Sequence, residues 1–281
     1  MSETRTTKLG VVVRYVLLVV AGLIALFPIV WAASAAIRPR SDTFSNISPM
    51  SWRTFFPTEF TLQNFRDLFA SGPWDRYFFN TVGVALVTTV LSVIVCSLAA
   101  YALARVNIRG SKYIFAFVLS MAILPFEVIA FPLYLVVREL GLLDTYAALV
   151  LPFIGNAFII FLLRQFFTDV PKAYEEAARL DGAGPIRIYV TVFLPLTWPA
   201  HVTAALLSFQ ESWDQFLWPL IATSSEEVRV LQLGISTFIS NETTQWGALF
   251  AAVSMTMTPP ILLFLFLQRY YIRGLSTTGL K

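Results

Sequence analysis

Three carboxylates stand inside long apolar stretches of this 281-residue sequence: Glu127, Glu211 and Asp214. The last two are three residues apart, so they share one face of a helix. In a membrane, a charge near the bilayer centre costs about 2.5–3.5 kcal/mol on insertion scales, so each should face a cavity or a partner. A carboxylate there could accept hydrogen bonds from solute hydroxyl groups, or it could bind and release protons.

Amide and indole side chains lie close to two of these acids. Gln210 and Gln215 are each four residues from one of the carboxylates, and Trp213 and Trp218 are nearby. An indole face packs on the C–H face of a sugar, and carboxylates and amides accept hydrogen bonds from its hydroxyl groups. Carboxylates repel an anion, so these side chains together suit an uncharged polyhydroxy solute better. Asn156, in another apolar stretch, belongs either to the same path or to an interhelical hydrogen bond. For the whole set two interpretations stay open: contact with substrate, or structural and gate-lining roles.

The composition indicates that the bilayer is the solvent. The chain is 57% hydrophobic and 13% charged, whereas soluble domains carry roughly 25% charged residues. A net charge of +3 is too small to suggest nucleic acid. The sequence contains neither a phosphate-loop motif nor a metal-ligand cluster, and it has one histidine and one cysteine. We therefore expect a protein that is not an enzyme, with no metal, and any ATP chemistry must come from another chain.

Six stretches are long enough to cross a bilayer as helices, which takes about 20 residues. They are Tyr15–Ile37, Asn80–Ala104, Tyr113–Val137, Thr145–Leu163, Ile188–Thr223 and Trp246–Gln268. The prediction is an all-α polytopic membrane protein with six transmembrane helices, forming one domain over residues 1–281. The fifth stretch would measure about 54 Å as a straight helix. We expect Pro195, Pro199 and Pro219 to break or kink it.

The distribution of basic residues predicts the orientation. With the N-terminus inside, 13 of the 20 Lys and Arg residues fall on the cytoplasmic side. Both termini are then cytoplasmic, as is the segment 171–182. The long first outer loop, 38–77, is either a lid over the bundle or a surface for an extracytoplasmic partner.

Segment 171–182 predicts a short, Ala-rich amphipathic helix between two apolar stretches. Gly182 suits the left-handed position just after a helix. Glu175 and Arg179 are spaced i,i+4 in the favourable order, so we expect an ion pair on the exposed face. A helix with a polar, water-soluble face is not expected in lipid-buried chain, so we interpret this helix as a docking element.

The charges around this helix favour a protein partner over a lipid surface. The segment Arg164–Arg187 contains four cations and four anions, whereas headgroup anchors are strongly basic. Another face of the helix carries Ala173, Ala177 and Leu180, and its small side chains permit close approach by a partner backbone.

A longer pattern contains this helix and points to a family. Its elements are Glu176-Ala177-Ala178, Asp181-Gly182, Val192 and Leu194-Pro195. The pattern resembles the signature loop of permease subunits from binding-protein-dependent ABC importers. The resemblance covers nearly the whole chain and is closest to the smaller permease of maltose-type carbohydrate importers. It includes the stretch Ser208–Leu220 and the tail Arg273-Gly274-Leu275-Ser276. Asp214 departs from the Asn that is common in the family, and Glu211 is an additional carboxylate.

The resemblance implies a type I importer permease in a bacterial or archaeal inner (plasma) membrane, moving a sugar or sugar-like solute inward. It implies as partners a homologous second permease, an ATPase dimer that binds ATP and Mg²⁺, an extracytoplasmic solute-binding protein and membrane lipid. Glu176 would make the electrostatic contact with the ATPase, and Gly182 would set the turn. The tail from Arg273 and Gly274 would reach the ATPase, and the loop Ser224–Gln245 would probe the binding protein.

Two alternatives remain at this point. A proton-coupled secondary transporter would use Glu127, Glu211 and Asp214 as titrating groups, but it leaves the docking helix unexplained. An ABC importer for glycerol phosphate or a polyol would share the architecture, although the three acids weigh against a phosphate ester.

Overall fold

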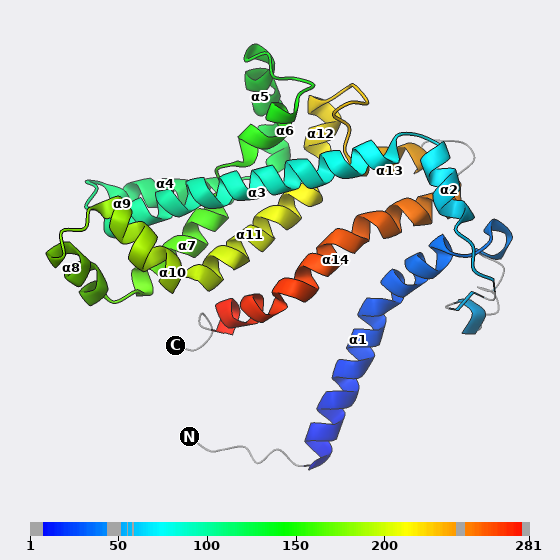
Figure 1. The fold of residues 1–281 in the computed structure, drawn as a ribbon, viewed down its shortest axis with the longest axis horizontal. Helices are drawn as coiled ribbons and strands as arrows, with labels where there is room; N and C mark the ends of the chain where they lie inside the picture. The colour runs from blue at the N-terminus through cyan, green and yellow to red at the C-terminus, as the bar shows by residue number, and fades with distance from the viewer. Residues whose placement is uncertain (1–7, 44–51, 55, 58, 240–244, 277–281) are drawn as a thin grey trace. The chain divides into compact units, whose positions relative to one another are not determined.

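Every regular element that the computed structural model describes is a helix (Figure 1). The described residues are 8–43, 52–54, 56–57, 59–239 and 245–276. The prediction of an all-α fold is confirmed for this part of the chain. Parts of the first outer loop, of the loop Ser224–Gln245 and of the C-terminal tail lie outside the described residues.

Contacts within the chain divide it into two compact units, each described here by itself. Unit 1 comprises Met1–Trp74 and Ile235–Thr258, and unit 2 comprises Asp75–Gly234 and Pro259–Lys281. The early helices of unit 1 are α1 (Lys8–Ala36), the 3₁₀ turns Arg40–Asp42 and Trp52–Thr54, and α2 (Gln63–Ala70). Two later helices, α13 (Leu231–Ile239) and α14 (Trp246–Ser276), contain the boundaries between the units. One domain over the whole chain stays a prediction.

Unit 2 holds the remaining helices, beginning with α3 (Trp74–Arg105) at the boundary. Its middle part consists of α4 (Ser111–Met121), α5 (Phe126–Glu139), α6 (Tyr146–Val150), the 3₁₀ turn Leu151–Phe153 and α7 (Ala157–Asp169). Then follow α8 (Lys172–Leu180), α9 (Pro185–Ile188), the π-helical turn η4 (Tyr189–Phe193), α10 (Leu194–Leu196), α11 (Trp198–Trp213) and α12 (Leu217–Ala222).

Three described helices are long and apolar enough to cross a membrane without a break. Their apolar segments are Gly10–Ala36, Trp74–Arg105 and Trp246–Gln268, which fall on the stretches expected for the first, second and sixth spans. Three further pairs of helices pass the same test together but are bent at a short break, which gives up to six spans. The chain is a polytopic, all-α membrane protein.

The stretch predicted as the third span is two helices rather than one. α4 ends and α5 begins after a break of four residues, with a bend of 101° between them. Pro125 occupies the position before α5 with an extended backbone, at a ψ of 142°. A proline has no N–H group and disfavours helix in the residue before it. Pro132, by contrast, lies inside α5.

The fifth predicted span is also interrupted, partly where its prolines suggested. It bends by 83° between α10 and α11, and Pro195 and Pro199 flank this bend. The second interruption differs from the prediction. α11 ends at Trp213, and the break follows at once, while Pro219 lies inside the short helix α12. A proline in the first turns of a helix removes no hydrogen bond, so α12 accommodates it.

Two apolar clusters hold unit 2 together. The first surrounds Phe167 and Phe193, which are fully buried, and includes Tyr101 and Cys96 of α3. The second surrounds Trp218, whose indole N–H donates to the carbonyl oxygen of Ala148 at 2.8 Å. Trp218 thereby fixes α12 to α6.

In unit 1 a single amide joins α2 to the end of α1. The buried Asn64 Nδ2 donates to the carbonyl oxygens of Ala36 and Arg38 at 3.0 and 2.8 Å. Gly247 of α14 lies against the same side chain. A Cβ atom added to this glycine would lie 2.7 Å from Cγ of Asn64, closer than packed atoms approach.

This contact predicts that Gly247→Ala destabilises the protein by roughly 1–3 kcal/mol, the usual cost of overpacking. The added methyl group would displace the Asn64 amide and weaken its bonds to the end of α1. The measurement is the thermal unfolding midpoint of the purified protein in detergent.

Gly22→Ala in α1 is the matched control, because nothing lies within 4 Å of a Cβ atom there. Its midpoint should equal or exceed that of the wild type, since alanine favours helix over glycine. Equal midpoints for the two variants would contradict the proposed role of the Asn64–Gly247 contact.

Candidate functional site

The predicted docking helix forms as α8, and its ends are defined by local sequence. Pro171 precedes the first residue of α8, and Gly182 lies just after the end of the helix with a φ of +76°. The N–H of Gly182 donates to Arg179 O at 3.0 Å, and the N–H of Ala183 donates to Ala178 O at 2.9 Å. This pair of bonds is a Schellman motif, which needs a left-handed residue and therefore favours glycine. The expectation for the turn at Gly182 is confirmed.

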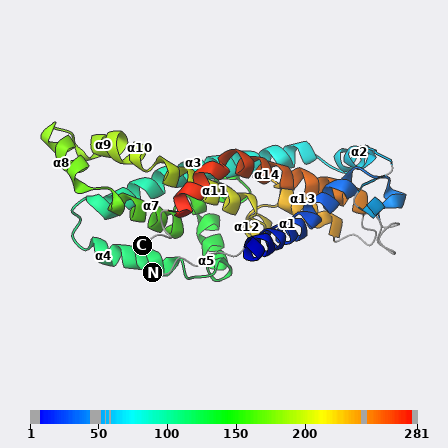
Figure 2. The ribbon, with the colours of Figure 1, turned by 90° about the horizontal axis from the view of Figure 1, so that it is seen from below.

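One surface of α8 is open. Glu176, Ala177 and Asp181 are exposed, and Leu180 is 90% exposed. In Figures 1 and 2, α8 and α9 lie together at the C-terminal end of α3. Ile186, in α9, is 77% exposed. Apolar and acidic side chains are thus exposed together at this end of α3.

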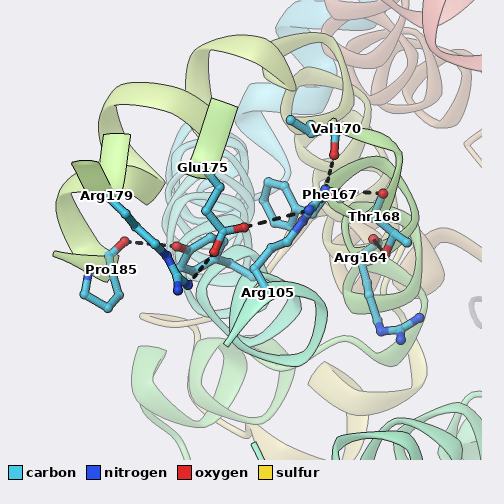
Figure 3. A network of polar contacts seen from close by, with 9 residues as sticks. Arg105, Arg164, Phe167, Thr168, Val170, Glu175, Arg179 and Pro185 are labelled. Atoms are coloured by element: carbon cyan, nitrogen blue, oxygen red, sulfur yellow. Dashed lines mark hydrogen bonds and ion pairs between the residues drawn. The ribbon is translucent and has the colours of Figure 1, made fainter. Parts of the chain in front are cut away.

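The opposite side of α8 carries Glu175, whose buried carboxylate lies between Arg179 and Arg105. Glu175 Oε1 lies 2.5 Å from Arg179 Nη2, so the predicted i,i+4 pair forms. Its predicted position on the exposed face is wrong, because the Glu175 side chain is only 11% exposed. Glu175 Oε2 turns toward Arg105 of α3, with 3.8 Å to Arg105 Nη1, and Figure 3 shows this carboxylate between the two arginines.

Arg105 also binds the chain just before α8. Its Nε donates to Phe167 O at 2.9 Å, and its Nη2 donates to the carbonyl oxygens of Phe167, Thr168 and Val170 (Figure 3). Phe167 and Thr168 lie in the last turn of α7, whose carbonyls have no N–H donor four residues on within the helix, and Val170 follows the helix. Phe167 O also accepts from the N–H of Val170 at 3.4 Å. The Arg105 side chain is 6% exposed. Removing one partner of such a buried charge pair costs about 3–5 kcal/mol.

α3 holds the chain after α8 as well. Tyr101 Oη donates to Pro185 O at 3.1 Å. One turn earlier, Ser97 Oγ lies 2.8 Å from Tyr189 Oη and 2.7 Å from His201 Nε2. Leu194 and Pro195, the end of the sequence pattern, form the start of α10 between η4 and α11. The pattern therefore runs from an exposed helix to the bend within the fifth span.

The sequence interpretation missed Arg105 and Tyr101 as parts of this site. A signal was present, because Ser97, Tyr101 and Arg105 recur every four residues in the second half of this helix, which is mostly apolar. Such spacing places polar groups in one row along a helix.

Two of the polar groups inside the spans are joined across helices. Asn156 Nδ2 donates to Glu211 Oε2 at 2.6 Å, while Asn156 Oδ1 accepts from the N–H of Ile159 and caps α7. Within α11 and its end, Gln210 Nε2 donates to Asp214 Oδ2 at 2.5 Å. Glu211, Gln210 and Asp214 are exposed in the isolated chain. A polar surface is thus present at the end of α11.

The two indoles near these acids are used for packing. Trp213 is 1% exposed and stacks on Phe209 with ring centroids 5.4 Å apart. Trp218 is fully buried. Gln215 is half-buried and lines a small pocket with Thr81 and Trp213. Neither indole presents an open face to a sugar in this conformation.

The remaining predicted residues lie elsewhere. Glu127 is exposed in the first turn of α5, directly after the 101° break, where a helix N-terminus favours an anion. Within the described residues, no hydrogen bond joins it to Glu211 or Asp214. Arg273 and Gly274 belong to the last turns of α14. The described residues contain no group of three His, Cys, Asp or Glu side chains that could hold a metal ion.

The loop after α12 is held in place by Asp144 and Asn80. Asp144 Oδ1 accepts from the N–H groups of Ser224 and Ser225, both at 2.9 Å, and these bonds lower the pKa of Asp144. Asn80 Nδ2 donates to the carbonyl oxygens of Glu227 and Arg229 in the same loop, at 2.8 and 2.9 Å. The segment 224–230 therefore has a defined shape.

Comparison with known proteins agrees with this arrangement. Residues 96–277 match the family described as the binding-protein-dependent transport system inner membrane component. An arabinooligosaccharides transport system permease protein from Halalkalibacterium halodurans is 34% identical over 259 residues, covering 92% of each chain. An sn-glycerol-3-phosphate transport system permease protein from Pectobacterium atrosepticum is 34% identical over 269 residues, covering 93% of this chain and 94% of the relative.

A third relative is a sulfoquinovosyl glycerol transport system permease protein from Agrobacterium fabrum, 31% identical over 91% of this chain and 89% of its own. Among solved structures, a bacterial ABC transporter involved in the import of the acidic polysaccharide alginate matches with a TM-score of 0.79. That match has 26% identity and covers 96% of this chain and 99% of the other. The family match, the permease relatives and the shared fold together show that this chain belongs to the inner membrane components of binding-protein-dependent transport systems, as a permease subunit of an ABC importer.

Proposed function

We propose that this permease imports a sugar or sugar-like solute and is driven by a separate ATPase that docks on α8. The observation that carries the proposal is the two-sided character of α8. Its inner side is fixed by Arg105 and Glu175, while Leu180 stands 90% exposed on the outer side. The chain has no phosphate-loop motif, so ATP and Mg²⁺ would be bound by the partner.

The residues of α8 take distinct roles in this docking. Glu176 would make a charge-assisted contact with the ATPase, beside Ala177 and Asp181. Ala178 is half-buried against the cluster around Phe193, so its small side chain lets α8 lie close to the spans. Gly182 would keep the turn that returns the chain to the membrane. Leu194 and Pro195 would relay movement into α11.

We further propose that α8 and both termini are cytoplasmic. The support is the excess of Lys and Arg on this side of the six spans. The segment 224–230 would then lie on the outer side, together with the described parts of the loop 38–77. Its fixed shape suits contact with a solute-binding protein. A homologous second permease would complete the pathway, and the tail from Arg273 and Gly274 would contact the ATPase.

The proposed solute class is polyhydroxylated. The transport systems named for the relatives act on arabinooligosaccharides, sn-glycerol-3-phosphate and sulfoquinovosyl glycerol, which are rich in hydroxyl groups and include anions. In this chain, Gln210 and Asp214 at the end of α11, together with Asn156 and Glu211, supply amide and carboxylate groups for hydroxyls. Carboxylates favour a neutral sugar over a phosphate ester, so glycerol phosphate stays the second candidate.

A proton-coupled mechanism finds less support. Its three acids are spread over two broken spans, and Glu127 makes no described bond with the other two. Membership of the ABC importer family accounts for α8, which the proton-coupled mechanism leaves without a role.

The docking surface predicts that Leu180→Asp releases the ATPase. Burying a leucine contributes about 1.5–3 kcal/mol, so the variant should bind the ATPase about tenfold or more weakly. The measurement is the amount of ATPase subunit that copurifies with the tagged permease complex. Leu140→Asp is the control, because Leu140 is 66% exposed in the turn after α5 on the proposed outer side. Equal retention by the two variants would argue against docking on α8.

The charge of Glu176 on α8 predicts that Glu176→Ala uncouples ATP hydrolysis from solute binding while the complex stays assembled. In the reconstituted complex with its binding protein, solute stimulation of ATP hydrolysis should fall about tenfold. A hydrogen bond to a charged group contributes roughly 1.5–3 kcal/mol, which is enough for this loss.

Glu139→Ala, at an exposed glutamate at the end of α5, is the control and should retain stimulation. The same assay with arabinooligosaccharides, other neutral sugars, polyols and sn-glycerol-3-phosphate would identify the solute class. Stimulation by the phosphate ester alone would select the second candidate. Uptake that follows a proton gradient with no copurifying ATPase would refute the importer mechanism.

A further inference from the structure

We propose that Arg105 is the positioning residue through which α8 moves α3 during the transport cycle. This inference rests on the proposed docking of an ATPase on α8 and names the helix that receives its movement. The family pattern at residues 176–195 does not include Arg105, and it points along the chain toward α11 instead.

Arg105 binds α8 and the segment before it at the same time. Its guanidinium group faces Glu175 at 3.8 Å and donates to the carbonyls of Phe167 and Val170 (Figure 3). The guanidinium carbon also lies 5.0 Å from the centroid of the Phe193 ring, within the buried cluster. A movement of α8 toward or away from the membrane must therefore act on this side chain.

The helix α3 also binds the segment after α8. Tyr101 donates to Pro185 O, and Ser97 contacts Tyr189. Ser97, Tyr101 and Arg105 lie in one row along α3, with Arg105 nearest to α8. Both ends of the docking helix are thus attached to the same helix, so α8 and the second half of α3 should move as one body.

Water cannot easily replace the contact between Arg105 and Glu175. The side chains of Arg105 and Glu175 are 6% and 11% exposed, whereas Arg179, on the other side of Glu175, is 62% exposed. Separating Glu175 from Arg105 would leave the carboxylate with Arg179 alone and the guanidinium group with backbone carbonyls alone, both largely shielded from water, while an exposed pair is readily solvated. The contact between Glu175 and Arg105 should therefore resist separation, whereas water can replace Arg179 as a partner of Glu175.

The test compares Arg105→Gln with Arg105→Lys in the complete transporter, reconstituted in lipid vesicles with its binding protein. Solute taken up per ATP hydrolysed is measured together with ATPase copurification. Arg105→Gln should retain the ATPase yet lower the uptake per ATP at least about fivefold, the lower end of typical coupling between sites. Arg105→Lys keeps the charge opposite Glu175 but loses the fork that reaches several carbonyls, so it should recover part of the coupling.

Arg109→Gln is the matched control, because Arg109 is exposed four residues beyond Arg105. Its uptake per ATP should equal that of the wild type. Glu175→Gln should lower the uptake per ATP as Arg105→Gln does. In the double variant Arg105→Gln/Glu175→Gln, the uptake per ATP should be no lower than in either single variant.

Unchanged uptake per ATP in Arg105→Gln and Glu175→Gln would overturn the inference. So would loss of assembly in both variants with full recovery by Arg105→Lys, because the arginine would then serve folding alone. Failure of the docking proposal is distinguishable, since in that case Leu180→Asp would not release the ATPase. If Leu180→Asp releases it while the Arg105 variants stay coupled, docking holds and only the role of Arg105 falls.

Discussion

Backbone polar groups in apolar surroundings need hydrogen-bond partners, and the described structure is organised around this constraint. Three of the apolar stretches are broken, and each break leaves carbonyls or N–H groups without helical partners. Side chains also bond backbone groups within or at the ends of helices, either from the same segment or from another helix. Asn156 accepts from the start of α7, Arg105 donates to the carbonyls at its end, and Trp218 donates to a carbonyl of α6. Arg105 and Trp218 thereby also fix their own helices against α7 and α6.

Arg105 shows how one such bond leads to a functional surface. Because it binds the end of α7 and Glu175 together, the side chain that completes one helix also anchors the next. With its inner side held in this way, α8 can leave Leu180 and Glu176 exposed without losing its position. A protein partner can then act on a firmly attached element. The physical basis of the proposed coupling is therefore the hydrogen bonding and ion pairing that hold the end of α7 and Glu175 of α8 to α3.

The polar groups within the spans divide between packing and an exposed surface. The indoles of Trp213 and Trp218 are buried, so they contribute to the stability of α11 and α12. The amides and carboxylates at the end of α11 remain exposed in the isolated chain, and one of them pairs with Asn156. Under the proposed function, contact with a hydroxylated solute would fall to these hydrogen-bonding groups, because neither indole presents an open face in this conformation.

The sequence alone determined the all-α membrane fold, the bend between Pro195 and Pro199, and the turn at Gly182. The length of an apolar stretch, the missing N–H of proline and the left-handed backbone of glycine are local properties, so they can be inferred from the local sequence. Only the tertiary structure decided that Glu175 is buried and that Asn156 pairs with Glu211. These outcomes depend on side chains from other helices, which spacing within one segment cannot reveal. The burial of an ion pair is a property of the packed chain, because it requires the second helix that excludes the water.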